Sequence, residues 1–231
     1  YFPPPKESFV LNMAAAEEPG RSRSAALVRG ALRLAVAAGA PFYGIHAGYL
    51  ARADADEDGS FRFDDTMSSY PEALDRAVAF VNVIAPEFEA QGVRFLVENL
   101  FPSPKKRHSL FCSVEEIQEF MAQVPDSVGL LLDLGHMNVS CNIMGLDRDT
   151  FINDYLDSFA GRLVEVHVSG NEGKKDEHLA VKQGSWQLDA LRRVHQAADA
   201  NSPPRVYCIE ARNASADELR ESVALVDDII A

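Results

Sequence analysis

The chain has 231 residues, of which 35 are acidic and 22 are basic, and its formal charge at pH 7 is −13. This charge disfavours nucleic acid as a partner, because DNA-binding proteins usually neutralise phosphates with clustered Lys and Arg. We find no apolar run long enough to span a bilayer, no secretory leader and no paired cysteine spacing. We therefore expect a cytoplasmic protein with no membrane segment.

Short apolar runs rich in β-forming residues alternate along the chain with longer segments of helical periodicity. In chain order, the predicted strands are 42–46, 93–98, 128–133, 163–167 and 206–210, with a weaker candidate at 9–11. The predicted helices are 22–38, 71–90, 114–122, 150–159, 186–198 and 216–230. Gly39 and Gly92 follow the first two helices, as expected of helix ends, and Pro86 predicts a kink or an early end in the second.

This alternation predicts parallel βα units in a single α/β domain over residues 1–231. The loops after the strands are longer than those before them, which is typical of parallel barrels that carry function at the strand carboxyl ends. An open doubly wound sheet would normally have a glycine-rich phosphate loop after its first strand, and we find none. We predict a (β/α)8 TIM barrel. The chain opens at Tyr1 and runs directly into Pro3, Pro4 and Pro5, so we expect this chain to lack the N-terminal strand or strands of the barrel.

A residue of metal-ligand type closes each clear strand. These residues are His46, Glu98, Asp133, His167 and Glu210. Burying an unpaired carboxylate or imidazole costs several kcal/mol unless it is paired or bound to a metal. Because parallel strands bring their carboxyl ends to one rim of a barrel, the pattern predicts a site for a divalent cation. Asp176 and His178, in the loop after His167, add another carboxylate and imidazole.

Four strings carry a resemblance to a known family. They are FLVEN at 95–99, LLDLGH at 131–136, VEVH at 164–167 and GKKDEHL at 173–179. Together they resemble the sugar phosphate isomerase/epimerase superfamily, the xylose isomerase-like TIM barrels to which endonuclease IV is related. The resemblance extends from about Phe9 to the C-terminus.

The resemblance implies a set of metal ligands. Glu98, Asp133, His167 and Glu210 match the central ligands of the isomerases and epimerases. His46 matches a ligand of another metal in endonuclease IV, and the set that holds its third metal is matched by His136, Asp176 and His178. The first histidine of the endonuclease has no counterpart before His46, where Lys6 lies near the matching place. We expect one to three divalent ions, of Mn, Mg, Co, Zn or Fe, with one or two favoured.

The resemblance also implies a reaction. The expected activity is isomerisation or epimerisation of a sugar, polyol or sugar phosphate through an enediolate, with Glu98 and Glu210 as the acid/base pair. Asn99, Arg212 and Lys174 are candidate substrate-binding residues, although a solvated loop is the simpler reading of Lys174. The expected partner is a small carbohydrate, and barrels of this kind can form homo-oligomers.

Three alternatives stay open at this point. The first is a multi-metal phosphodiester hydrolase of the endonuclease IV type, which the extra ligands favour and the acidic charge disfavours. The second is a dehydratase or oxidase that uses iron or manganese on the same barrel. The third is a barrel that has kept the site without catalysis.

Two loop segments suggest weaker sites. The run from Asp54 to Asp58 resembles the start of a calcium loop, with a solvated acidic loop as the simpler reading. The basic cluster at 105–108 is either an exposed loop or an anion-binding lip beside the metal site.

Overall fold

The computed structural model describes residues 9–56, 61–104, 106–198 and 202–231 and divides into two compact units. Of the described residues, the N-terminal unit comprises 9–56, 61–98, 106–111 and 116–129, and the C-terminal unit comprises 99–104, 112–115, 130–198 and 202–231. None of the helices in these described ranges is both long and apolar enough to cross a bilayer.

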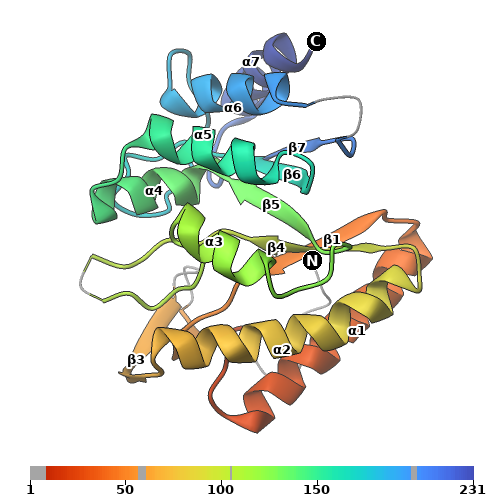
Figure 1. Ribbon diagram of the computed structural model, residues 1–231. Helices are drawn as coiled ribbons and strands as arrows, with labels where there is room; N and C mark the ends of the chain where they lie inside the picture. The colour runs from red at the N-terminus through yellow and green to blue at the C-terminus, as the bar shows by residue number, and fades with distance from the viewer. Residues whose placement is uncertain (1–8, 57–60, 105, 199–201) are drawn as a thin grey trace. The chain divides into compact units, whose positions relative to one another are not determined.

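The N-terminal unit is built on two parallel strands covered by two long helices (Figure 1). Its elements are α1 (Glu18–Ala38), β1 (Phe42–His46), β2 (Ala51–Ala55), β3 (Phe61–Met67), α2 (Tyr70–Glu89) and β4 (Arg94–Glu98). Strand β1 pairs with β4 in a register that sets His46 opposite Glu98. The two predicted ligands therefore end neighbouring strands.

The two helices have the boundary signals that the sequence predicts. Helix α1 ends at Gly39, whose φ of 66° is left-handed and suits a residue without a Cβ. Helix α2 begins with a capping box between Ser69 and Glu72. The sequence predicted a kink or an early end at Pro86. The helix instead includes Pro86 and ends three residues later, at Glu89.

An antiparallel hairpin of β2 and β3 follows β1, where the sequence predicts only an acidic loop. The Asp54 carboxylate lies 3.5 Å from the guanidinium of Arg52, and the Asp56 carboxylate lies 2.9 Å from that of Arg62. Their carboxylates are thus already near positive charge, and residues 57–60 of the calcium-like run lie outside the described residues.

The predicted strand at 9–11 is wrong. No strand occurs there, because the backbone of the following Asn12 hydrogen-bonds the Ser24 side chain of α1 instead of a neighbouring strand.

The C-terminal unit has three parallel strands and four helices that follow them in sequence. Its elements are β5 (Gly129–Asp133, of which Gly129 falls in the other unit), α4 (Leu134–Met144), α5 (Arg148–Phe159), β6 (Leu163–Val168), α6 (Trp186–Gln196), β7 (Val206–Ile209) and α7 (Ala216–Ile230). Helix α3 (Val114–Met121) has residues in both units. The register aligns Asp133 with His167, and His167 with Cys208. Helix α4 starts directly after Asp133, in a segment for which we predicted no helix.

Candidate functional site

Three predicted ligands meet at the strand ends of the C-terminal unit. Asp133 ends β5, His167 lies near the end of β6 and Glu210 directly follows β7. Nδ1 of His167 lies 3.7 Å from Oδ2 of Asp133 and 3.5 Å from Oε2 of Glu210. Neighbouring parallel strands in this register hold the three side chains at one edge.

Three further side chains close these ligands into a ring. Nδ1 of His178 lies 3.5 Å from Oε2 of Glu210, and its Nε2 contacts Asp176. Nε2 of His136 lies 3.6 Å from Oδ2 of Asp176 and 3.9 Å from Oδ2 of Asp133. Carboxylates and imidazoles alternate around the ring, which we call the acid–imidazole ring; its members are Asp133, His167, Glu210, His178, Asp176 and His136.

The imidazoles control the ionisation of the carboxylates. Burial acts to raise the pKa of Asp133, but His136 and His167 outweigh it and hold that pKa below its ordinary value. The pKa of Asp176 is lowered in the same way by His136 and His178, against the effect of burial. The hydrogen bond to Asp176 raises the pKa of His178, although burial opposes this. At neutral pH the carboxylates of the ring are therefore ionised.

Asp133 provides the test of whether a cation fits. Its side chain is fully buried, and Oδ2 has no hydrogen-bond partner among the described residues. An ionised oxygen in that position is costly unless something positive faces it. Ligands about 2.0–2.2 Å from one ion lie roughly 3–4 Å from each other, which matches the distances from Nδ1 of His167 to the carboxylates of Asp133 and Glu210. The residues present fit a divalent cation.

Asn99 holds Asp133 and His136 in position. Its amide donates to the backbone oxygen of Asp133 at 3.0 Å and accepts from the backbone N–H of Asp133 at 2.7 Å. Nδ1 of His136 lies 2.8 Å from the Asn99 carbonyl, which turns Nε2 toward the carboxylates. Both ends of the Asn99 amide are thus engaged, so its geometry suits positioning rather than the substrate contact we expected.

Gly135, Ser169 and Asn171 complete the support of the ring, and sequence reasoning missed all three roles. The Asn171 amide donates to the Gly135 carbonyl at 2.9 Å. A Cβ on Gly135 would lie 2.4 Å from Oγ of Ser169 and 2.9 Å from Nδ2 of Asn171. The glycine in the Asp-Leu-Gly-His string was the available signal for this tight packing. The side chains that occupy the space beside it, Ser169 and Asn171, lie more than thirty positions later in the sequence.

The loop that carries His178 has a constrained backbone. His178 has a φ of 48°, a left-handed conformation that non-glycine residues adopt mainly where surrounding contacts enforce it. Its carbonyl accepts a 2.7 Å hydrogen bond from the backbone N–H of Arg212. The side chains of Arg212 and Lys174, the other two candidate substrate contacts, are exposed.

In the N-terminal unit, Glu98 and His46 form a pair of their own. Nε2 of His46 lies 3.5 Å from Oε2 of Glu98, and the Glu98 side chain is almost entirely buried. Nδ1 of His46 lies 2.7 Å from the hydroxyl of Tyr49, which orients the ring. Phe61, on the hairpin, packs edge-on against both rings.

The basic cluster at 106–108 is neutralised within the same unit. Lys106 contacts Asp65, Arg107 contacts Glu116, and His108 is buried and stacked on the Phe63 ring with centroids 4.4 Å apart. Lys105 lies outside the described residues. These pairings disfavour the anion-binding lip.

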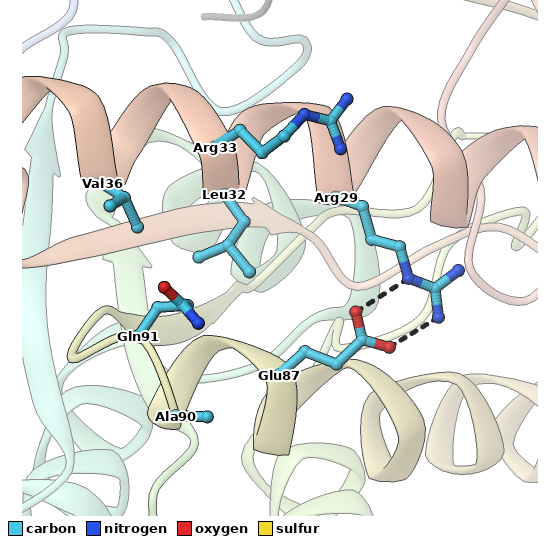
Figure 2. A pocket seen from close by; sticks show the side chains of 7 residues that line it. All are labelled: Arg29, Leu32, Arg33, Val36, Glu87, Ala90 and Gln91. Atoms are coloured by element: carbon cyan, nitrogen blue, oxygen red, sulfur yellow. Dashed lines mark hydrogen bonds and ion pairs between the residues drawn. The ribbon is translucent and has the colours of Figure 1, made fainter.

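A shallow hollow of about 580 Å³ lies between α1 and α2 of the N-terminal unit. Figure 2 shows Leu32 and Val36 of α1 facing the end of α2, and Arg29 bound through two hydrogen bonds to Glu87. Both helices end there and lead into the starts of β1 and β4, so the hollow is at the opposite strand ends from His46 and Glu98. It contains no carboxylate–imidazole group and contributes nothing to the candidate site.

Comparison with known proteins gives the family. A family model described as a xylose isomerase-like TIM barrel matches residues 3–229. The chain belongs to this family. The predicted α/β barrel class is thereby confirmed, as is the resemblance on which the ligand assignments depend.

Individual relatives are distant. An uncharacterized protein of Methanocaldococcus jannaschii is 24% identical over 229 residues, which cover 96% of this chain and 69% of the relative. Among solved structures, a D-tagatose 3-epimerase-like protein has a TM-score of 0.69 at 22% identity, with 96% of this chain and 76% of that chain covered. A D-psicose 3-epimerase from Clostridium cellulolyticum H10, solved with D-tagatose, has a TM-score of 0.65 at 16% identity, with coverages of 95% and 73%. At these identities the likeness establishes the fold.

Proposed function

We propose that this protein is a divalent-metal-dependent isomerase or epimerase that acts on a sugar, polyol or sugar phosphate through an enediolate. The observation that carries the proposal is the buried Oδ2 of Asp133, ionised and without a hydrogen-bond partner among the described residues, facing His167 and His136. The sugar epimerases among the similar structures support the substrate class.

The proposal assigns the cation to Asp133, His167 and Glu210, with Glu98 as a fourth ligand. Within the C-terminal unit, His167 lies at a distance that suits a shared ion from both Asp133 and Glu210. Glu98 is assigned on the FLVEN string that ends β4, which resembles the corresponding motif of the superfamily. A divalent cation supplies polarisation of a carbonyl and stabilisation of the negative charge that develops on its oxygen.

Proton transfer is assigned to the two glutamates. Burial acts to raise the pKa of Glu210, but His167 outweighs it, and the pKa lies below its ordinary value. Glu210 therefore starts as an ionised carboxylate that can accept a proton from the substrate carbon at Oε2. Glu98 would then act as the acid and donate a proton to the opposite face of that carbon. In the reverse reaction the two glutamates exchange these roles. His178, whose Nδ1 lies 3.5 Å from Oε2 of Glu210 and whose Nε2 contacts Asp176, can hold the Glu210 carboxylate in place.

A second candidate, a multi-metal phosphodiester hydrolase, is favoured by one specific observation. His136, Asp176 and His178 form a second carboxylate–imidazole group beside the first, which is more than an epimerase with one ion requires. We rank it lower because the chain is acidic and its described basic cluster is internally paired.

The proposal is tested by metal content and by proton exchange. The protein is purified without chelator, its metals are measured by elemental analysis, and ketoses and their phosphates are incubated with it in D2O. We expect one tightly held ion per chain and deuterium incorporation at the carbon beside the carbonyl. Glu210→Gln should slow this exchange by about 10²–10⁴-fold, the usual contribution of a general base.

Asp133→Asn should lose the ion while keeping the fold, and Asp154→Asn is the matched control. Asp154 is an exposed carboxylate of α5 in the same unit, and its replacement should leave metal content and exchange unchanged. A protein that takes up no Mn, Co, Zn or Fe, or that retains its ion in Asp133→Asn, contradicts the proposal. Two or three ions together with phosphodiester cleavage would support the second candidate.

A further inference from the structure

His167 presents a different group of neighbours on each side of its ring. Nδ1 faces Asp133 and Glu210, whereas Nε2 lies 3.4 Å from Oε1 of Glu165. Glu165 is two residues earlier on β6, so both side chains project from the same face of that strand. The proposed function uses only the Nδ1 side.

The neighbouring strand places a thiol beside His167 and Glu165. In the parallel pairing of β6 and β7, Cys208 lies directly opposite His167, and residues paired in this way point to the same face. Ligand atoms of Glu165, His167 and Cys208 all lie within 4.8 Å of one another. The side chains of Glu165 and His167 are 16% and 12% exposed, so they are largely shielded from water yet accessible to a small ion.

The chemistry of this trio differs from that of the acid–imidazole ring. Oxygen and nitrogen ligands suit Mn²⁺, Mg²⁺ and Co²⁺ as well as Zn²⁺, but a thiolate selects soft or borderline cations. Zinc binds one sulfur at about 2.3 Å with nitrogen and oxygen at about 2.0–2.2 Å. Two ligands at these distances from one ion lie roughly 3–4 Å apart, and the ligand atoms of the trio all lie within 4.8 Å of one another.

We propose that Glu165, His167 and Cys208 form a second cation site that takes thiophilic ions such as Zn²⁺ or Cd²⁺. Because this site uses the imidazole that the proposed catalytic set also needs, its occupation would inhibit the enzyme. Through the single sulfur of Cys208, this site would prefer Zn²⁺ or Cd²⁺ over Mg²⁺ or Mn²⁺, whichever ion activates the enzyme at the acid–imidazole ring.

The alternative role for Cys208 is that of a nucleophile, and its surroundings oppose it. Burial raises the pKa of the Cys208 thiol, and the carboxylates of Glu165 and Glu210 act in the same direction. Without a cation the group remains a protonated thiol, which is a poor nucleophile. A cation ligand is the role that its position beside an imidazole and a carboxylate supports.

The test measures Cd²⁺ binding to the full chain after chelation and removal of the chelator. Thiolate coordination to Cd²⁺ gives an ultraviolet charge-transfer band that oxygen and nitrogen ligands do not give. We expect the band to rise to a plateau with added Cd²⁺ and to disappear in Cys208→Ser. Glu165→Gln should retain the band and weaken Cd²⁺ binding by about tenfold or more, since loss of a supporting carboxylate has at least that effect on metal affinity.

Cys141→Ser is the matched control, because Cys141 is a buried thiol on α4 of the same unit. It should keep the full band, and melting curves of all variants confirm that they are folded. Zn²⁺ should displace Cd²⁺ and abolish the band, whereas Mg²⁺ should not.

Two results would overturn the inference. One is a Cd²⁺ band that persists in Cys208→Ser, and the other is the absence of any band in the unmodified chain. In the second case, a weaker Mn²⁺ affinity of Glu165→Gln would show that Glu165 only orients the His167 ring. The cation site itself is independent of the proposed function, whereas its inhibitory effect rests on that function. A Cys208-dependent band in a protein that exchanges no sugar proton would therefore contradict the proposed activity and leave the site standing.

Discussion

Asp133 uses its two carboxylate oxygens for different purposes. Oδ1 accepts the backbone N–H of His136 at 2.8 Å and thereby caps α4, while Oδ2 faces the imidazoles of His136 and His167. The cap fixes the carboxylate in one orientation, so the second oxygen is preorganised for its partner. A ligand held in this way loses little side-chain entropy when an ion binds.

Gly135 is a position at which one added methyl group should lower the unfolding free energy. In Gly135→Ala the new Cβ meets Asn171 and Asp133 at 2.9 and 3.0 Å, and both of those side chains are held by hydrogen bonds. We expect a loss of about 1–3 kcal/mol, as is usual for overpacking. Chemical denaturation measures it.

Gly30→Ala serves as the control for that substitution. Gly30 is inside α1, and the nearest atom to an added Cβ is 3.7 Å away, at the flexible end of Arg33. Here alanine should stabilise the chain by about 0.4–1 kcal/mol through helix propensity and reduced unfolded-state entropy. Equal effects at the two positions would contradict the packing argument.

The pair of Asp176 and His178 predicts how the stability of the metal-free chain depends on pH. The raised pKa of His178 contributes stability that is complete below its unfolded value of about 6.5 and is lost as pH rises through the folded value. The lowered pKa of Asp176 contributes stability that is present above about pH 3.9 and is lost as pH falls through its folded value.

Denaturation in the presence of a chelator, at pH values from acid to mildly alkaline, measures this dependence. The unfolding free energy is expected to be greatest between about pH 4 and 6.5. In Asp176→Asn, its decrease above pH 6.5 should be smaller than in the unmodified chain. A decline of the same size in the variant would assign it to other groups, such as His136 or His167.

The sequence predicted the ring better than its supports. His167, Asp133 and Glu210 were identifiable because a charged residue at the end of a buried strand needs a partner. The bonds from the Asn99 side chain to the Asp133 backbone could not be predicted, because they depend on tertiary structure. Glu165 gave no signal, since a charged residue inside a strand also fits a solvent-facing position.

At the scale of elements, the strands and helices that sequence reasoning located best are those with strong boundary signals. Strand β1 and helix α7 have the predicted bounds. Helix α4 was missed because Gly135 and Asn138 are weak helix formers, and the Asp133 cap compensates for them only once β5 is in place. The β2–β3 hairpin was missed because its charged residues obscure the alternation of apolar and polar side chains that identifies a strand.

Helix α7 tests the value of such boundary signals. Oγ of Ser215 accepts the backbone N–H of Glu218, whose carboxylate returns to Ser215 at 2.8 Å. Ser215→Ala should cost about 1 kcal/mol of unfolding free energy. Ser22 is an exposed position within α1 whose hydroxyl contacts Glu18 on the same helix but caps no helix end, so Ser22→Ala should cost less than Ser215→Ala. Similar losses in both variants, measured by denaturant titration, would argue against a capping role.

At the scale of the whole molecule, the charge of −13 makes the most direct prediction. The chain should not bind duplex DNA at about 0.15 M salt, because an acidic surface gains nothing from counterion release. Fluorescence anisotropy with a labelled duplex, with and without an abasic site, measures this. Affinity that falls steeply with added salt would revive the hydrolase candidate.

The start of α4 directly at Asp133 has an electrostatic consequence for the C-terminal unit. An eleven-residue helix concentrates about half a positive charge at its N-terminus through the alignment of its peptide dipoles. This partial charge belongs to the backbone, so neither chelation nor a change of pH removes it while the helix is folded. Even without an ion, the edge formed by Asp133 and His136 therefore keeps a permanent field that offsets part of the charge of the neighbouring carboxylates and favours an approaching oxyanion.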